Sequence, residues 1–288
     1  MRALASLSVL LALAASGCGS DTGGANACGT GPVEGNTSRA MATSYALGTQ
    51  ATSCVATASD VHYFDLAAPG DATGGYVQGT VDGTLGIDVY AQGDTTPVAH
   101  IDPDPAGGPT TFFLAIAPGE DYQLGFKHQG AFANAYTFTL TTTYTPVPDA
   151  YEPNDALAMA SPVTEGVAIN GYLFGGRLGG DATPSATDDY SDYYRFSAVA
   201  GTVTVHIDTV PTDVAPRLTL YGLDGSELAR VANGIKGGAL QMVSPSVAAP
   251  GDLIVRVTPW SGAPPSMGTG IVLPDHFTQA YTLTISQP

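Results

Sequence analysis

Apolar and polar residues alternate along much of the chain, which is typical of β-strands with one buried face and one wet face. From Tyr136 to Thr143, for example, threonines at every second position alternate with Phe138 and Leu140. Short runs of this kind are separated by Gly- and Pro-rich turns. The pattern predicts strands over residues 62–66, 85–90, 111–116, 122–127, 136–143, 193–196, 202–207, 217–221, 253–257 and 281–285. The best helical candidate is Asn154–Ala160, about two turns long.

An internal repeat organises these strands. Four landmarks occur twice in the same order: Ser59–Leu66 with Tyr190–Phe196, Leu85–Tyr90 with Arg217–Tyr221, Pro118–Tyr122 with Pro250–Leu253, and Phe132–Leu140 with Phe277–Ile285. A repeat of this length indicates duplicated domains. The predicted fold class is therefore all-β, with two tandem antiparallel β-sandwich (jelly-roll-like) domains over 44–145 and 146–288. A linker bearing Pro146 and Pro148 separates them.

The amino-terminal end predicts export. Arg2 precedes an apolar run from Ala3 to Ala15, which is shorter than the roughly 20 residues that a membrane-spanning helix needs. Residues 1–17 are therefore interpreted as a secretory signal peptide, the alternative being a buried N-terminal helix. Residues 18–43, rich in Gly, Ser, Thr, Asn and Ala, are predicted to form a flexible tether.

A lipid anchor is expected at the end of that signal. Ala15-Ser16-Gly17-Cys18 resembles a bacterial lipobox, with Ala15 in place of the usual Leu. The resemblance implies lipidation of Cys18 and location at the outer membrane or cell surface, since Gly19 and not an aspartate follows the cysteine. The alternative is an ordinary secretory signal followed by an unmodified cysteine.

The charge of the chain bears on its binding partners, and its cysteine content bears on disulfide formation. The formal net charge is −17, and a surface this acidic repels phosphate backbones, so nucleic acid is not an expected partner. Cys28 and Cys54 remain once Cys18 is set aside. In an oxidising envelope these two are expected to form a disulfide, the alternative being two separate thiols.

The segment from Tyr151 to Asp155 begins a series of motifs that points to a particular protein family. Tyr-Glu-Pro-Asn-Asp here is followed by Asp189–Phe196 (Asp-Tyr-Ser-Asp-Tyr-Tyr-Arg-Phe), Gly201, Leu218–Tyr221, Pro250-Gly251 and Tyr281–Ile285. This order resembles the bacterial pre-peptidase C-terminal domain, a small β-sandwich often attached to secreted proteases and collagenases. The resemblance covers about residues 149–287. It covers 44–145 more weakly, because that half has no Glu-Pro-Asn-Asp motif.

The same resemblance implies a metal site. In related collagen-binding modules the acidic motif and later aspartates hold calcium, which takes six to eight oxygen ligands. Carried over, the ligand candidates are Glu152, Asn154, Asp155, Asp189 and Asp192. One family carboxylate is replaced by Ala150, beside which Asp149 is a substitute. The alternative is structural: Asn and Asp next to Pro also form turns and cap strands.

Catalytic motifs are not recognisable in the sequence, which contains no Gly-x-Ser-x-Gly, no His-Glu-x-x-His and no phosphate-binding glycine loop. The five histidines occur singly, so no zinc site is expected. Trp260 is a candidate for stacking on a ligand, or else covers the end of the second sandwich.

These features predict a non-catalytic surface lipoprotein that engages a polymer, either a polysaccharide or a fibrous protein. Two alternatives stay open. One is a structural or accessory subunit of an envelope or secretion assembly, joined through an exposed sheet edge. The other is a hydrolase of a type that the sequence does not reveal.

Overall fold

The computed structural model describes residues 36–67, 74–82, 84–91, 93–97, 99–104, 106–116, 121–147, 149–173, 191–259, 267–269 and 273–288. The described residues form β-strands and three short 3-10 turns: η1 (Arg39–Met41), η2 (Leu157–Met159) and η3 (Asp275–Phe277). The predicted all-β class is confirmed. The helix expected over Asn154–Ala160 was wrong, because only η2 forms there. None of the helical segments in the described ranges is long and apolar enough to cross a membrane.

The first half of the chain contains two sheets. One has the order β1-β3-β8-β5-β6, formed by Thr43–Tyr45, Val61–Ala67, Asp121–His128, Leu85–Ala91 and Ala99–Ile101. The other contains β7-β4-β9-β2, formed by Thr110–Ile116, Gly75–Val81, Tyr136–Pro146 and Gln50–Val55. Alternate residues of both sheets meet in one apolar core that includes Phe64, Phe112, Phe126 and Phe138. The arrangement is a β-sandwich.

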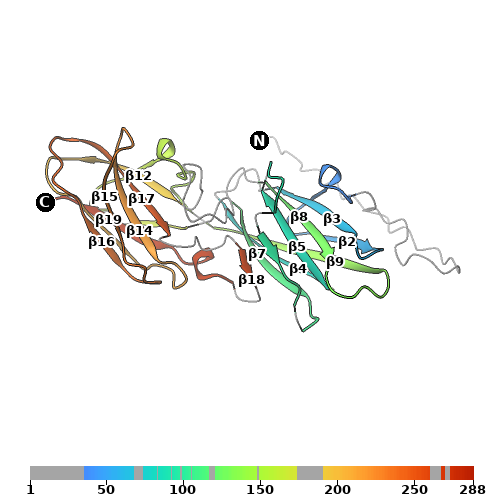
Figure 1. Ribbon diagram of the computed structural model, residues 1–288. Coiled ribbons are helices and arrows are strands. Elements are labelled where there is room, and N and C mark those ends of the chain that lie inside the picture. Colours follow the sequence, from blue (N-terminus) through green and yellow to red (C-terminus); the bar gives the residue numbers. More distant parts are fainter. Residues whose placement is uncertain are drawn as a thin grey trace, which may run out of the picture.

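The second half repeats this arrangement. One sheet has the order β10-β12-β17-β14-β15, formed by Ser161–Pro162, Asp192–Ala198, Gly251–Pro259, Pro216–Gly222 and Glu227–Ala232. The other is β11-β19-β13-β16, formed by Ile169–Gly171, Tyr281–Ser286, Thr204–Asp208 and Leu240–Val243. Their shared core is separate from the first and includes Tyr194, Phe196, Val255 and Tyr281. Figure 1 shows the two sandwiches side by side, blue to green and yellow to red.

The strand order supports the internal repeat. In each half a short edge strand runs parallel to its neighbour: β1 pairs with β3, and β10 pairs with β12. The next three strands also correspond, with β8, β5 and β6 matching β17, β14 and β15. The landmarks that repeat in the sequence lie on β3 and β12, on β5 and β14, at the start of β8 and β17, and on β9 and β19.

One segment crosses from the second half to the first. Strand β18 (Met267–Thr269) pairs antiparallel with β7, where Gly268 lies opposite Phe113. The short red strand is visible beside β7 in Figure 1. A third apolar cluster joins the halves here, made by Tyr76, Phe113, Ala115, Val147, Tyr172, Leu273 and Phe277. The sequence-based division at residue 146 does not anticipate this exchange, which protects the edge of β7 from other strands.

Candidate metal centre

The Glu-Pro-Asn-Asp motif is fastened to the first long strand of the second sandwich. The backbone carbonyl of Asn154 accepts a hydrogen bond from the N–H of Tyr193 on β12, with an N···O distance of 2.9 Å. Within the motif, the Glu152 carboxylate accepts a bond from the Asn154 N–H at 3.1 Å. The motif is therefore held against the strand position that carries Asp192.

Three carboxylates converge at this point. Glu152, Asp155 and Asp192 each place one oxygen so that all three oxygens lie within 4.8 Å of one another. Calcium–oxygen bonds are 2.3–2.6 Å long, so two ligands of one ion can be up to about 5 Å apart. In the described part of the chain, this is the only set of three acidic, histidine or cysteine side chains with such geometry.

Two tyrosines support Asp192 from inside the core. The Tyr281 hydroxyl donates a hydrogen bond to an Asp192 carboxylate oxygen, and the hydroxyls of Tyr194 and Tyr281 are 2.6 Å apart. Gly171 makes this pair fit, because a Cβ at that position would lie 2.4 Å from the Tyr194 hydroxyl and 2.5 Å from that of Tyr281. The tyrosines fix the side chain of Asp192 on the buried side of β12.

Electrostatics make the cluster unfavourable when it carries only negative charge. Burial, together with the negative charges of Asp155 and Asp149, raises the pKa of Glu152 to about 8. The pKa of Asp192 is also raised well above its usual range, chiefly by burial and then by the charge of Glu152. Such shifts mean that the fold opposes ionisation of these carboxyls unless a cation or a proton balances them.

Asn154 provides an independent sign of a missing partner. The residue is fully buried, and neither its side-chain oxygen nor its nitrogen has a hydrogen-bond partner of acceptable geometry within the described residues. Burial and the charge of Asp192 raise the pKa of the nearby Tyr194 hydroxyl well above its usual range, and the Asn154 amide opposes this rise. A buried amide without a bond costs roughly 1–3 kcal/mol. A cation bound by the amide oxygen would relieve part of this cost.

The donor set fits calcium. Carboxylate and amide oxygens are hard ligands that Ca²⁺ and Mg²⁺ prefer, and their number suits the larger ion with waters completing the shell. Asp149 does not belong to the convergent set, since its two oxygens accept the N–H groups of Tyr151 and Tyr172, each at 2.9 Å. It acts instead as a neighbouring charge that raises the pKa of Glu152.

The structure thus brings together three of the five ligand candidates, Glu152, Asp155 and Asp192, with Asn154 adjacent. The fifth, Asp189, lies outside the described residues, as do Trp260, Cys18 and Cys28. Cys54 is disulfide-bonded, and its pairing with Cys28 stays a prediction.

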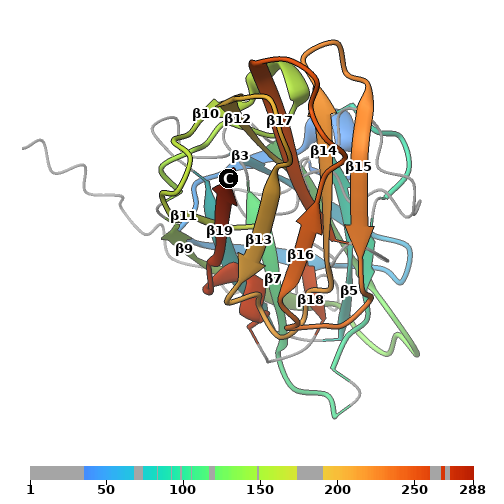
Figure 2. The same cartoon turned by 90° about the vertical axis from the view of Figure 1, so that its left-hand side faces the viewer.

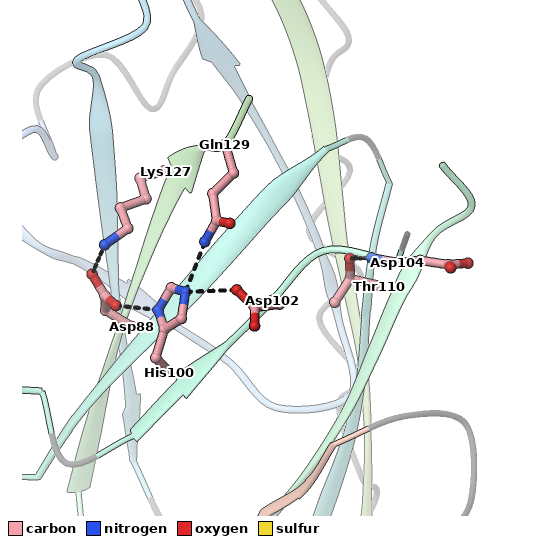
Figure 3. A network of polar contacts seen from close by, with 7 residues as sticks. All are labelled: Asp88, His100, Asp102, Asp104, Thr110, Lys127 and Gln129. Carbon is pink, nitrogen blue, oxygen red and sulfur yellow. Dashed lines mark hydrogen bonds and ion pairs between the residues drawn. The ribbon is translucent and has the colours of Figure 1, made fainter. Parts of the chain in front are cut away.

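A second polar network lies on the first sandwich, and sequence reasoning missed it. In Figure 3 the buried Asp88 carboxylate on β5 contacts Nδ1 of His100 at 2.6 Å and Nζ of Lys127 at 2.8 Å. Nε2 of His100 lies 2.7 Å from Nε2 of Gln129 and 3.4 Å from an Asp102 oxygen. These contacts tie β6 to β5 and β8, a structural role. Little in the sequence indicated this network, because β6, which carries His100, is only three residues long.

Comparisons with known proteins yield no family. No model of a protein family matches the chain, and no curated protein matches it. Solved structures with partial similarity include a Paenibacillus xanthan lyase (14% identity, 83% of this chain and 25% of that one, TM-score 0.24). Another is the tandem CBM51 modules of a family 98 glycoside hydrolase from Streptococcus pneumoniae (9% identity, 82% and 83%, TM-score 0.23). The chain spans about a quarter of the xanthan lyase chain, and TM-scores this low carry no argument about function.

Proposed function

We propose that this chain is a calcium-stabilised, non-catalytic binding protein of the cell surface, related to pre-peptidase C-terminal domains and anchored through a lipid on Cys18. The observation that carries the proposal is the convergence of Glu152, Asp155 and Asp192 beside the buried Asn154, whose side-chain amide has no partner of good geometry among the described residues. The site lies between β12 and the segment that joins β9 to η2. Its role is to hold the second sandwich in a rigid form that presents its surface to an extracellular polymer.

The physical basis is a cross-link. Glu152 and Asp155 lie in the segment between β9 and η2, and Asp192 belongs to β12, so one ion bound by all three joins two segments that are distant in sequence. A ligand that binds only the folded state stabilises it by about 2.7 kcal/mol at one hundred times its dissociation constant. Calcium also removes the repulsion that raises the pKa of Glu152.

Differential scanning calorimetry of the whole protein tests the proposal. We expect millimolar Ca²⁺ to raise the melting temperature, and Asp155→Ala to abolish that rise. The matched control is Asp102→Asn, because the Asp102 side chain is 83% exposed and lies on the other sandwich, so its calcium response stays that of the unaltered protein. A melting temperature that does not respond to calcium, or an equal response in Asp155→Ala, would remove the site.

A further inference from the structure

The basic residues of this acidic chain are unevenly placed. The chain has only nine lysines and arginines against 26 aspartates and glutamates. Four of the nine lie on the outer side of the sheet β10-β12-β17-β14-β15, the side that faces away from the core of the second sandwich: Arg195, Arg217, Arg230 and Arg256. Figure 2 shows the strands that carry them, β12, β17, β14 and β15, side by side. We call these four residues the arginine face.

Strand register brings the arginines close together. Thr219 on β14 lies opposite Arg256 on β17 and opposite Arg230 on β15. Two strand spacings, about 10 Å, therefore separate the backbones of the two arginines. Arg217 lies two residues from Thr219 on β14, so it points to the same side. Thr219 and Thr258 beneath them are buried while the arginines reach solvent, which indicates that arginine stems cover the sheet.

The positive charges affect one another. The pKa of Arg217 is lowered, first by burial and then by the positive charges of Arg256 and Arg230. In the described part of the chain, two carboxylates of the strands share this side of the sheet: Glu227 pairs with Arg230, and Asp252 accepts a hydrogen bond from Ser197 at 2.7 Å. The Arg256 guanidinium bonds to the neutral hydroxyl of Ser191 at 2.6 and 2.9 Å. Among the described residues, four arginines against two carboxylates give this face a net positive charge.

We propose that the arginine face binds a carboxylated polysaccharide, which names the ligand class of the polymer-binding function proposed above and rests on it. Planar guanidinium groups bind carboxylates through paired hydrogen bonds, and arginine is suited to this more than lysine. Arginines on neighbouring strands of one sheet fit an extended polymer with spaced acidic groups. An acidic peptide would instead pair with an exposed sheet edge through its backbone.

Charge argues against nucleic acid as the occupant. Duplex DNA carries about one charge per 1.7 Å, so it meets the long-range repulsion of a chain with net charge −17. A polysaccharide with one carboxylate per disaccharide has a lower charge density. Its repulsion by the acidic remainder of the chain is correspondingly weaker than that of DNA.

Isothermal titration calorimetry of the whole protein, with calcium present, tests the inference. The probe is a hyaluronan oligosaccharide, which has a glucuronate in every disaccharide, and the matched ligand control is the same oligosaccharide with methyl-esterified carboxyls. We expect the acidic form to bind and the ester not to bind. Binding should weaken as NaCl is raised, because salt screens charge pairs at a protein surface.

Variants assign the binding to this face. Arg217→Gln with Arg230→Gln should weaken binding by about tenfold or more, since a hydrogen bond to a charged group is worth roughly 1.5–3 kcal/mol and 1.4 kcal/mol is tenfold. Arg230→Lys keeps the charge but loses the planar fork, so an intermediate loss is expected. Lys236→Gln removes one positive charge at the exposed turn that follows β15, outside the arginine face, and should leave binding unchanged.

The outcomes separate this inference from the proposed function. Equal binding of acid and ester, equal loss in Lys236→Gln, or binding of poly-L-glutamate in preference to the oligosaccharide would each overturn the arginine face as a polysaccharide site. The calcium-induced rise in melting temperature is measured on the same samples. If that rise persists without oligosaccharide binding, the calcium site stands and the ligand class is wrong. If oligosaccharide binding persists without a calcium-induced rise in melting temperature, the arginine face stands as the polysaccharide site and the calcium site is wrong.

Discussion

The two sandwiches share a strand order but differ at one equivalent position. In the second half the carbonyl of Asn154 accepts the Tyr193 N–H, and the preceding strand residue is Asp192. In the first half the carbonyl of Asn36 accepts the Tyr63 N–H, also at 2.9 Å, and the preceding residue is His62. The same backbone contact therefore supports an acidic cluster in one half and a histidine in the other.

The consequences for hydrogen bonding are opposite. Nδ1 of His62 lies 2.8 Å from the Asn36 amide oxygen and 3.0 Å from the Ser53 hydroxyl, and the Asn36 amide nitrogen donates to the Tyr63 carbonyl. The first half closes this corner with the side chains of a histidine, an asparagine and a serine. In the second half the described residues give the Asn154 amide no partner of good geometry, and the three carboxylates of Glu152, Asp155 and Asp192 converge. The fold does not require the acidic cluster, so we interpret the cluster as a ligand site added to a common scaffold.

The largest expected effect on stability comes from the apolar cluster that joins the two halves, which we call the junction cluster. Phe277 is fully buried in the junction cluster, and its ring lies 5.6 Å from that of Tyr76 in the first sandwich. Phe277→Ala should lower the free energy of unfolding by roughly 3–4 kcal/mol, because it removes a large buried ring and leaves a cavity. Calorimetry should also show the heat transitions of the two halves moving apart.

A control at the surface sharpens this test. Leu223 lies in a turn of the second sandwich and is 57% exposed, so Leu223→Ala should change stability by no more than about 0.5 kcal/mol. A Phe277→Ala protein that melts like the unaltered one would show that the halves do not depend on the junction cluster.

The next expected effect is a pH dependence of the free energy of unfolding that arises from the acidic cluster. Without calcium, the folded protein keeps a proton on Glu152 up to a pH of about 8, whereas the unfolded chain releases it near its ordinary pKa. The folded state thus binds more protons in this window, and stability falls as the pH rises from about 5 to about 8. We expect a loss of up to about 3 kcal/mol, since each pH unit in this window costs at most about 1.36 kcal/mol, measured by urea unfolding in calcium-free buffer.

Substitution separates this slope from other titrating groups. Glu152→Gln should flatten it, and saturating calcium should remove it because the ion balances the carboxylates. Asp102→Asn should leave the slope as it is, since that carboxylate is exposed on the other sandwich. A calcium-free protein whose stability rises with pH across this window would contradict the electrostatic account of the cluster.

A smaller effect compares two tyrosines at equivalent places in the repeat. Tyr281→Phe removes the hydroxyl that bonds Asp192 and contacts that of Tyr194, all buried, and should cost roughly 1–2 kcal/mol. Tyr136→Phe removes a hydroxyl 3.0 Å from Nδ1 of the half-buried His128 and should cost less, about 0.5 kcal/mol. Urea unfolding measures both. Equal losses would mean that Asp192 gains nothing from its tyrosine.

Most of the long strands were predictable because an alternating or continuous apolar pattern marks them. Val61–Ala67 shows buried and half-exposed or exposed residues in strict alternation, as its sequence suggests. Short edge strands such as β1, β6 and β10, two or three residues long, were not predictable, since their partners and not their residues define them. Strand β4 was also missed. A Cβ at Gly79 of this strand would lie 2.0 Å from the ring of Phe112, so the packing requires glycine there. In the sequence, that glycine resembles a turn residue and hides the strand.

For the candidate site, the sequence supplied the residue types and their order. It did not show that Asn154 would be buried without a bond, nor that Tyr194 and Tyr281 would meet behind Asp192. It also did not show the arginine face, because Arg217, Arg230 and Arg256 become neighbours only through the pairing of β17, β14 and β15.

By itself the sequence determined the all-β class, the duplicated order of strands and the acidic motif at the start of the second repeat. These depend on local alternation and on residues that are close along the chain. Tertiary structure decided which carboxylates converge, where the arginines gather and that β18 joins the sheet of the other sandwich. Those contacts join positions far apart in sequence, and the free energy that selects them comes from burial and charge that only the assembled sheets create.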